Sequence, residues 1–168
     1  GDLITRASGL SINAEKSLIK YQYSVIGVMP KQKSWFPKAS MVELAKVILP
    51  IIQRFKNIVG YGGSMGGYAA IKYSNLLNMN RIIAFVPQYS IDPEQVEDRR
   101  YAEFFDAVAN KDMQIQLQDV DASREYIIVY DPYFSIDREH YLKIKEILPS
   151  LHTIHLPFTG HEALSVLA

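Results

Sequence analysis

The most constraining feature of this chain is the run Gly62-Gly63-Ser64-Met65-Gly66, which has the pattern G-x-S-x-G. A short apolar segment, 58–61, comes directly before it, and segment 67–73 is typical of a helix. A serine between a strand and a helix in this pattern indicates a sharp turn that exposes the hydroxyl, known as a nucleophile elbow. Such a turn crowds the backbone, and glycines two residues before and after the serine relieve the crowding. We therefore expect Ser64 at the end of a strand, at the positive end of a helix dipole.

Glycine and serine are common residues, so an ordinary glycine-rich turn between a strand and a helix is the alternative to a nucleophile elbow. Two other glycine-rich motifs are excluded by the residues themselves. A phosphate-binding P-loop requires lysine and then serine or threonine after its glycines, and no lysine follows these glycines. A dinucleotide-binding G-x-G-x-x-G motif that starts at Gly60 would need glycine where Met65 stands.

The composition indicates a globular protein with no electrostatic preference for a charged partner. The 168 residues predict a single domain over residues 1–168. With 18 basic and 18 acidic residues, the chain gives no reason to expect nucleic acid or an anionic membrane as a partner. It has no cysteine, so disulfides, thiolate zinc sites and cysteine nucleophiles are impossible. It shows no signal-peptide pattern and no apolar run of membrane-spanning length, so we expect a cytoplasmic protein.

Short apolar runs alternate with helical patterns along most of the chain. Five segments are typical of strands: 21–29, 57–61, 81–86, 125–130 and 152–156. Four segments are typical of helices: 40–55, 67–78, 94–110 and 137–148. Ser40 and Glu43 are spaced as a capping box for the first of these helices, and Pro50 is expected to kink it. The alternation predicts a three-layer α/β/α domain with a mainly parallel sheet, in which ligands bind at the carboxyl ends of the strands.

Three residues suited to acyl chemistry follow predicted strands: Ser64, Asp131 and His161. We expect them to converge at one edge of the sheet, although they are distant in sequence. A serine hydroxyl is a poor nucleophile until a base accepts its proton, and the base needs an acid to orient it. We therefore predict Ser64 as nucleophile, His161 as base and Asp131 as acid. Asp137 is the alternative acid, although it is also well placed to cap helix 137–148.

On these residues the chain resembles the α/β-hydrolase superfamily. The resemblance is carried by Gly-Tyr-Gly-Gly-Ser-Met-Gly-Gly-Tyr-Ala-Ala at 60–70, Ile-Val-Tyr-Asp-Pro at 128–132 and Thr-Gly-His-Glu-Ala-Leu at 159–164. It covers about residues 18–168, and the order serine, acid, histidine along the chain is that of this superfamily. The resemblance implies a reduced α/β-hydrolase fold with a cap-like insertion at about 88–124. Segment 85–93 also resembles a less characterised hydrolase subgroup that often occurs with bacterial polysaccharide-related proteins.

The resemblance further implies an oxyanion hole and a substrate pocket. The backbone N–H of Met65 is expected to be one oxyanion donor, and Lys31 or Gln32 the other, because Pro30 has no N–H. The residues expected to bind substrate are Trp35, Phe36, Gln88 and Tyr89. Core packing is the alternative for the first two.

Arg99 and Arg100 lie in the cap-like insertion, where they are candidates to pair with an anionic substrate. A solvated helix face is the simpler alternative for them. The function expected from the sequence is that of a serine esterase, which hydrolyses a small-molecule acyl ester through an acyl-enzyme on Ser64. The alternatives are acyl transfer to a sugar or alcohol, thioester or peptide hydrolysis, and a non-catalytic binding module of the same fold. No cofactor and no metal are expected, because the histidines lack a recognisable ligand pattern with carboxylates.

Overall fold

The protein is built on a parallel sheet. The computed structural model describes residues 9, 11–12, 15–164 and 166. Within them the sheet has four strands: β1 (Val59–Gly63), β2 (Arg81–Phe85), β3 (Glu125–Tyr130) and β4 (His152–His155). The strands lie side by side in chain order, and every neighbouring pair is parallel. The predicted α/β class with a parallel sheet is therefore confirmed.

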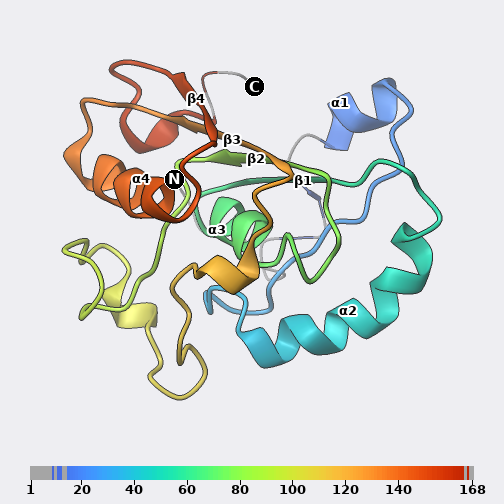
Figure 1. Cartoon of the computed structure of the whole chain (residues 1–168), viewed down its shortest axis with the longest axis horizontal. Helices are drawn as coiled ribbons and strands as arrows, with labels where there is room; N and C mark the ends of the chain where they lie inside the picture. The colour runs from blue at the N-terminus through green and yellow to red at the C-terminus, as the bar shows by residue number, and fades with distance from the viewer. Residues whose placement is uncertain (1–8, 10, 13–14, 165, 167–168) are drawn as a thin grey trace.

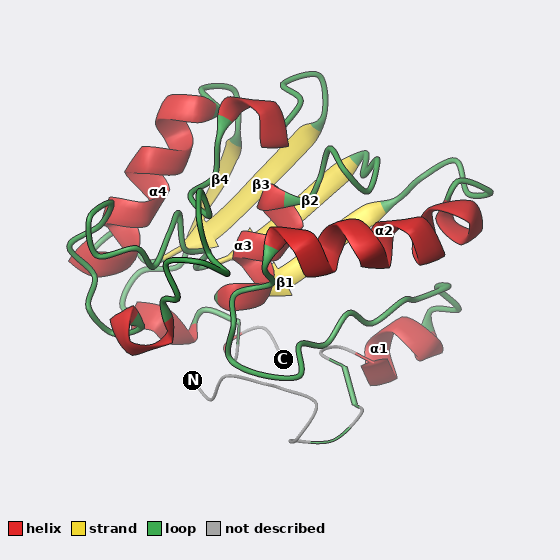
Figure 2. Ribbon diagram, turned by 90° about the horizontal axis from the view of Figure 1, so that it is seen from below, coloured by secondary structure: helices red, strands yellow, loops and turns green. Residues whose placement is uncertain are grey.

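The described residues form four α-helices: α1 (Glu15–Lys20), α2 (Lys38–Ile52), α3 (Met65–Lys72) and α4 (Ser135–Ile147). Helices α2, α3 and α4 lie on the same side of the sheet in Figure 1, and the view from below in Figure 2 has them in front of the strands. Helix α3 connects β1 to β2, and α4 connects β3 to β4. Because each strand steps to its neighbour in the same direction, right-handed crossovers bring these connecting helices to one face.

The core lies between this face of the sheet and the helices. Alternate strand residues point into it, as the period of a strand requires: Ile82 and Ala84 of β2 and Ile128 of β3 are buried. Tyr68 and Ile71 of α3 pack against them and are also buried. Residues of β1 and β4 that point to the other face are partly exposed: Val59 at 52%, Tyr61 at 41% and Ile154 at 48%.

Two predicted elements are wrong. Segment 21–29 forms no strand, and residues 21–28 are exposed. Its β-branched and aromatic residues favour a strand only where a neighbouring strand and a buried face are available. Segment 94–110 is not an α-helix and contains only the 3₁₀ helix η2 (Ala102–Phe104). Asp98 and Asp106 accept hydrogen bonds from backbone N–H groups two or three residues on, and such local bonds compete with a helix.

Helix α2 was predicted correctly, but its start was not. It begins at Lys38, after Pro37, and no side chain caps it through a hydrogen bond. Ser40 is therefore an exposed residue of the first turn rather than the cap. Pro50 lies inside the last turn of α2, two residues before the helix ends.

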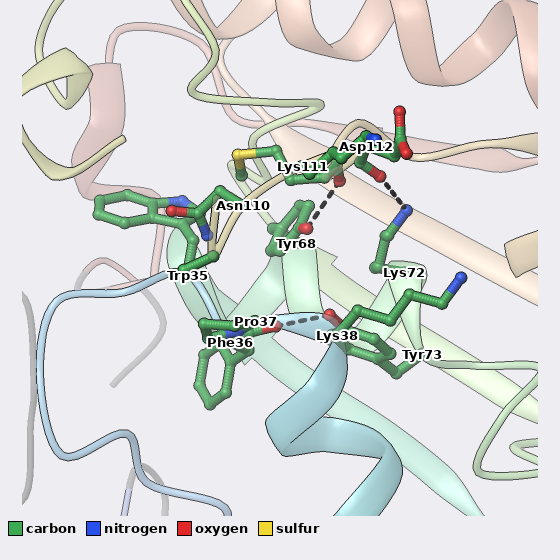
Figure 3. Close-up of a pocket in the computed structure, with 12 residues that line it drawn as sticks. Trp35, Phe36, Pro37, Lys38, Tyr68, Lys72, Tyr73, Asn110, Lys111 and Asp112 are labelled. Carbon is green, nitrogen blue, oxygen red and sulfur yellow. Dashed lines mark hydrogen bonds between the residues drawn. The ribbon is translucent and has the colours of Figure 1, made fainter. Parts of the chain in front are cut away.

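Segment 86–124, which connects β2 to β3, is fastened to α3 by buried polar side chains. The Lys72 ammonium, almost fully buried, donates to the carbonyl oxygens of Asp112 and Gln114 and to the Asp119 carboxylate, at 3.2, 2.7 and 2.7 Å. The Tyr68 hydroxyl donates to the Met113 carbonyl. Figure 3 shows Tyr68 and Lys72 pointing from α3 toward Asp112. The connection thus lies against the helix that carries Ser64 at its start.

Candidate active site

The turn at Ser64 has the conformation of a nucleophile elbow. Ser64 stands between β1 and α3 with φ 52° and ψ −120°, a conformation that is strained for a residue with a side chain. A Cβ atom on Gly62 would lie 2.4 Å from the carbonyl carbon of Gly66, so only glycine fits there. A Cβ on Gly66 would meet no atom within 4 Å, whereas one on Gly67 would lie 3.1 Å from the Phe85 carbonyl oxygen. The expected crowding is confirmed before the serine, and after it the close approach is at Gly67.

Ser64, His161 and Asp137 form a continuous hydrogen-bonded chain. The Ser64 Oγ atom lies 2.9 Å from Nε2 of His161, and His161 Nδ1 lies 2.7 Å from Asp137 Oδ2. The Asp137 side chain is 1% exposed and that of His161 12% exposed. A carboxylate only accepts hydrogen bonds, so Nδ1 of His161 carries the hydrogen. Nε2 is then free to accept the hydroxyl proton of Ser64.

The prediction that Asp131 orients His161 is wrong, because the alternative residue, Asp137, is the one bonded to the imidazole. Asp131 instead accepts hydrogen bonds from the backbone N–H groups of Tyr133 and Gly160, at 2.9 and 2.8 Å. Burial alone would raise the pKa of Asp131, but these N–H donors hold its pKa below the ordinary value. Asp131 therefore fixes the loop that carries His161 against the end of β3.

Gln88 is a buried side chain in contact with the serine. It follows β2, is 0% exposed, and lies with Nε2 3.1 Å from Ser64 Oγ. Its Oε1 accepts a hydrogen bond from the Trp35 indole at 3.3 Å, which assigns the orientation of the amide. Gln88 and Trp35, both predicted to bind substrate, are thus brought to the serine.

Tyr101 closes the site from the side of segment 86–124. Its hydroxyl lies 3.1 Å from His161 Nε2, the same nitrogen that faces Ser64. The Trp35 ring packs against Tyr101 and Phe104 with centroids 5.0 and 5.8 Å apart. Burial raises the pKa of Tyr101, although Arg100 and the hydrogen bond with Ser64 oppose that shift. The phenol therefore stays neutral and remains a hydrogen-bond donor beside the imidazole.

The other predicted binding residues take different places. Phe36 is buried in the core, and its carbonyl accepts a hydrogen bond from Tyr73. The backbone N–H of Tyr89 donates to His140 Nδ1, and Lys143 Nζ lies 5.9 Å from the centroid of the Tyr89 ring, so Tyr89 lies against α4. Lys31 and Gln32 are exposed, in the part of the loop that comes before Trp35.

Arg100 is held by carboxylates next to the His161 site and is not free to meet a substrate anion. Its Nη2 donates to Asp137 Oδ1 at 2.7 Å and to Asp98 Oδ2 at 2.8 Å, and its Nε donates to Asp98 Oδ1 at 3.0 Å. Burial lowers the pKa of Arg100, but the two carboxylates more than offset this and raise its pKa. Arg99, by contrast, is exposed, and its guanidinium donates to the backbone carbonyls of Pro93 and Val96.

Two further observations concern metal binding and membrane-spanning helices. Among the residues that the structure describes, no group of three histidine, aspartate or glutamate side chains is placed to hold a metal ion. No helix within those same residues is long and apolar enough to cross a membrane.

With this geometry established, comparison with known proteins identifies relatives in fold. No family model matches the sequence, and no curated protein matches it. The chain is similar in structure to the capsule O-acetyltransferase of Neisseria meningitidis serogroup A, with a TM-score of 0.63 and 17% identity. That match covers 93% of this chain and 76% of the acetyltransferase.

Two further structures share the fold. A variant of the same acetyltransferase in complex with CoA matches with a TM-score of 0.60 and 16% identity, over 92% of this chain and 76% of that one. A carboxylesterase of the thaumarchaeon Nitrososphaera gargenis matches with a TM-score of 0.59 and 12% identity, over 93% of this chain and 79% of that one. The chain thus has a fold that occurs in enzymes acting on esters.

Proposed function

We propose that the protein is a serine esterase in which Ser64 attacks a carboxylic ester and carries the acyl group as an acyl-enzyme. The observation that carries this proposal is the hydrogen-bonded chain from Ser64 through His161 to Asp137, with contacts of 2.9 and 2.7 Å. A serine with an imidazole at its hydroxyl and a carboxylate behind the imidazole is the arrangement that activates a weak nucleophile. The strained elbow supports the same assignment, because strain at a serine between a strand and a helix is typical of nucleophiles.

In the proposed reaction, His161 Nε2 accepts the Ser64 proton as Oγ attacks the carbonyl carbon of the ester. The carbonyl oxygen becomes an oxyanion, and the imidazolium is stabilised by the Asp137 carboxylate. Collapse of the tetrahedral intermediate breaks the bond to the alcohol, which leaves with the proton returned by His161. Water then attacks the acyl-enzyme in the same way and releases the carboxylic acid and free Ser64.

The oxyanion needs hydrogen-bond donors that are already in place. The N–H of Met65, the first residue of α3, is proposed as one donor. The second donor was predicted at Lys31 or Gln32, and this stays a prediction. We assign the Gln88 amide to the positioning of the acyl group, because Nε2 lies 3.1 Å from Ser64 Oγ in a fully buried place. Segment 88–124 is proposed as the cap over a single domain.

Acyl transfer is the second candidate function, and the fold similarity to a capsule O-acetyltransferase favours it. The same acyl-enzyme then passes its acyl group to the hydroxyl of a sugar or alcohol instead of water. His161 Nε2 has to accept the proton of that hydroxyl, and Tyr101 now lies at 3.1 Å from this nitrogen. The acceptor therefore either displaces the Tyr101 hydroxyl or receives a hydrogen bond from it.

A fluorophosphonate probe tests the acyl-enzyme chemistry without knowledge of the substrate. We expect a single adduct on Ser64, which is lost in Ser64→Ala and kept in Ser40→Ala, a matched exposed serine on α2. Folded protein that is not labelled, or that is labelled equally in Ser64→Ala, would rule the proposal out.

Hydrolysis and transfer are separated by the product. Unlabelled protein is given p-nitrophenyl acetate or acetyl-CoA, with and without a sugar acceptor, and the products are read by mass spectrometry. Free acetate in both cases supports the esterase, and acetylated sugar at the expense of acetate supports the transferase.

A further inference from the structure

We propose that Arg100 is a positioning residue that sets the acid limit of the reaction by partly neutralising Asp137 behind the imidazole of His161. The proposal rests on the proposed function of Ser64 and His161. Its basis is that the two carboxylate oxygens of Asp137 have different partners. Oδ2 lies 2.7 Å from His161 Nδ1, and Oδ1 accepts a hydrogen bond from Arg100 Nη2 at 2.7 Å. Both contacts are buried, since the Asp137 side chain is 1% exposed. The carboxylate is therefore fixed in its plane by one cation and one imidazole.

The guanidinium is itself held by a second carboxylate. Asp98 accepts Nε and Nη2 of Arg100 as a bidentate pair and also accepts the backbone N–H of Arg100, at 2.9 Å. Its side chain is 2% exposed. Burial alone would raise the pKa of Asp98, but hydrogen bonds from His140 and Arg100 hold it well below the ordinary value. Asp98 therefore remains an anion throughout the pH range in which a histidine base operates.

A buried histidine completes this arrangement on the far side. His140 is 0% exposed, and its Nδ1 accepts the backbone N–H of Tyr89 at 3.1 Å. The hydrogen of the neutral ring is thus on Nε2, which lies 3.1 Å from Asp98 Oδ2 and donates to it. Side chains from α4, from segment 86–124 and from the turn after β4 are joined in a line that ends at the serine: His140, Asp98, Arg100, Asp137, His161 and Ser64.

The charges of Arg100 and Asp98 decide in which direction each substitution moves the acid limit of the reaction. Coulomb repulsion from the Arg100 guanidinium opposes a second positive charge on the other side of Asp137, where His161 lies. Loss of Arg100 removes one positive charge and moves the acid limit up. Loss of Asp98 removes one negative charge and moves it down. Loss of both leaves the net charge unchanged.

The other ionisable groups around His161 are not substituted in any variant, although His140 loses its Asp98 partner in Asp98→Asn. They are Tyr101 of the insertion, Asp131 at the end of β3 and Glu162, the next residue in the chain. Tyr101 also packs against Arg100, whose Cζ lies 5.2 Å from the centroid of the Tyr101 ring, so Arg100→Met changes that contact, whereas Asp98→Asn leaves Arg100 in place.

The test is the pH dependence of fluorophosphonate labelling at Ser64, measured as a second-order rate in wild type, Arg100→Met and Arg99→Met. We expect the acid midpoint of Arg100→Met to rise by about one pH unit. Arg99→Met is the matched control, and its midpoint should equal that of wild type, since the Arg99 guanidinium donates to the uncharged carbonyls of Pro93 and Val96. Coincident profiles for the two variants would overturn the proposal.

Two more variants protect the test against loss of folding, because Arg100→Met leaves two buried carboxylates without their cation. Asp98→Asn should move the midpoint down, and Asp98→Asn/Arg100→Met should return it close to wild type while the plateau rate stays low. A purely structural role of Arg100 predicts lower rates with one common midpoint in all variants, which would overturn the proposal.

An NMR titration of the His161 ring proton separates this proposal from the proposed function. It needs no reaction at Ser64, and His161→Ala assigns the signal among the four histidines. If Ser64 is not labelled but the His161 titration moves up in Arg100→Met, the acyl-enzyme proposal fails and the effect of Arg100 stands. If Ser64 is labelled and the His161 titration does not move in Arg100→Met, the acyl-enzyme proposal stands and the proposed effect of Arg100 fails.

Discussion

Replacement of Asp137 by asparagine is expected to stop the reaction through the tautomer of His161. Arg100 donates to Oδ1 of residue 137, so the amide oxygen of asparagine has to take that place. The amide NH₂ then faces His161 Nδ1, which must become an acceptor, and the ring hydrogen moves to Nε2. A protonated Nε2 no longer accepts the Ser64 proton. The opposite amide orientation would set the NH₂ against the guanidinium, donor against donor, in a buried place.

The expected size is a loss of about 10⁴-fold in kcat, the effect of a wrong histidine tautomer in serine enzymes. This corresponds to about 5.4 kcal/mol of transition-state stabilisation. Asp131→Asn is the contrasting variant, since Asp131 accepts two backbone N–H groups and none from His161. Its amide keeps one acceptor and leaves one N–H unpaired, at a cost of about 1–3 kcal/mol in folding free energy. We expect about a tenfold loss in rate from the loosened His161 loop.

The rates are measured as fluorophosphonate labelling at Ser64 and as hydrolysis of p-nitrophenyl acetate, with thermal unfolding to show that each variant is folded. Asp137→Asn should be folded but almost unreactive, and Asp131→Asn should be less stable than wild type but far more reactive than Asp137→Asn. If Asp131→Asn is folded and loses as much reactivity as Asp137→Asn, the assignment of Asp137 is refuted.

Four other variants test the packing and the ion pairs around the site. Gly62→Ala places a Cβ 2.4 Å from the Gly66 backbone and should lower the free energy of urea unfolding by about 3 kcal/mol. A Cβ in Gly66→Ala meets no atom within 4 Å, so that variant should change the free energy of unfolding by less than about 0.5 kcal/mol. Equal effects would contradict the elbow packing. Lys72→Met leaves the partly buried carboxylate of Asp119 without its cation and should cost about 3 kcal/mol, read by thermal unfolding and by faster proteolysis within 86–124. Unchanged proteolysis would argue against this anchor. Folding lowers the pKa of Asp98, so the stabilisation from its carboxylate is complete above about pH 4 and is lost as the pH falls toward the folded-state pKa. The Tm difference between wild type and Asp98→Asn should therefore shrink below about pH 4. A constant difference would refute the ion pair.

The sequence predicts the sheet well where the strands consist of β-branched and aromatic residues. Segment 125–130 is predicted with the bounds that β3 has, and 81–86 differs from β2 by one residue. For β1 the prediction 57–61 is displaced from Val59–Gly63, because Gly62 and Gly63 resemble a turn. Their pairing with Ala84 and Phe85 of β2 makes them a strand, and that contact is absent from local sequence.

Ser64 and His161 were predicted from their position after strands, and the structure joins them. The same rule gives the wrong acid, because Asp131 also follows a strand. The rule places a residue at the edge of the sheet, but it does not say which oxygen the imidazole meets. That depends on the His161 loop, whose Gly160 N–H is already taken by Asp131. Asp137, in the first turn of α4, is then the carboxylate within reach of Nδ1.

The contact between Arg100 and Asp137 is possible because segment 94–110 does not form the α-helix that the sequence predicted. In a helix over 94–110, residues two apart point to different sides, and Asp98 would not face the side chain of Arg100. In the observed turn, Asp98 accepts the backbone N–H of Arg100 and folds back onto its guanidinium. The hydrogen bond from the Arg100 N–H to Asp98, which interrupts the helix, therefore also places the Arg100 guanidinium against Asp137. A substitution that restores helix in 94–110 should damage the site even though it removes no residue in contact with Ser64.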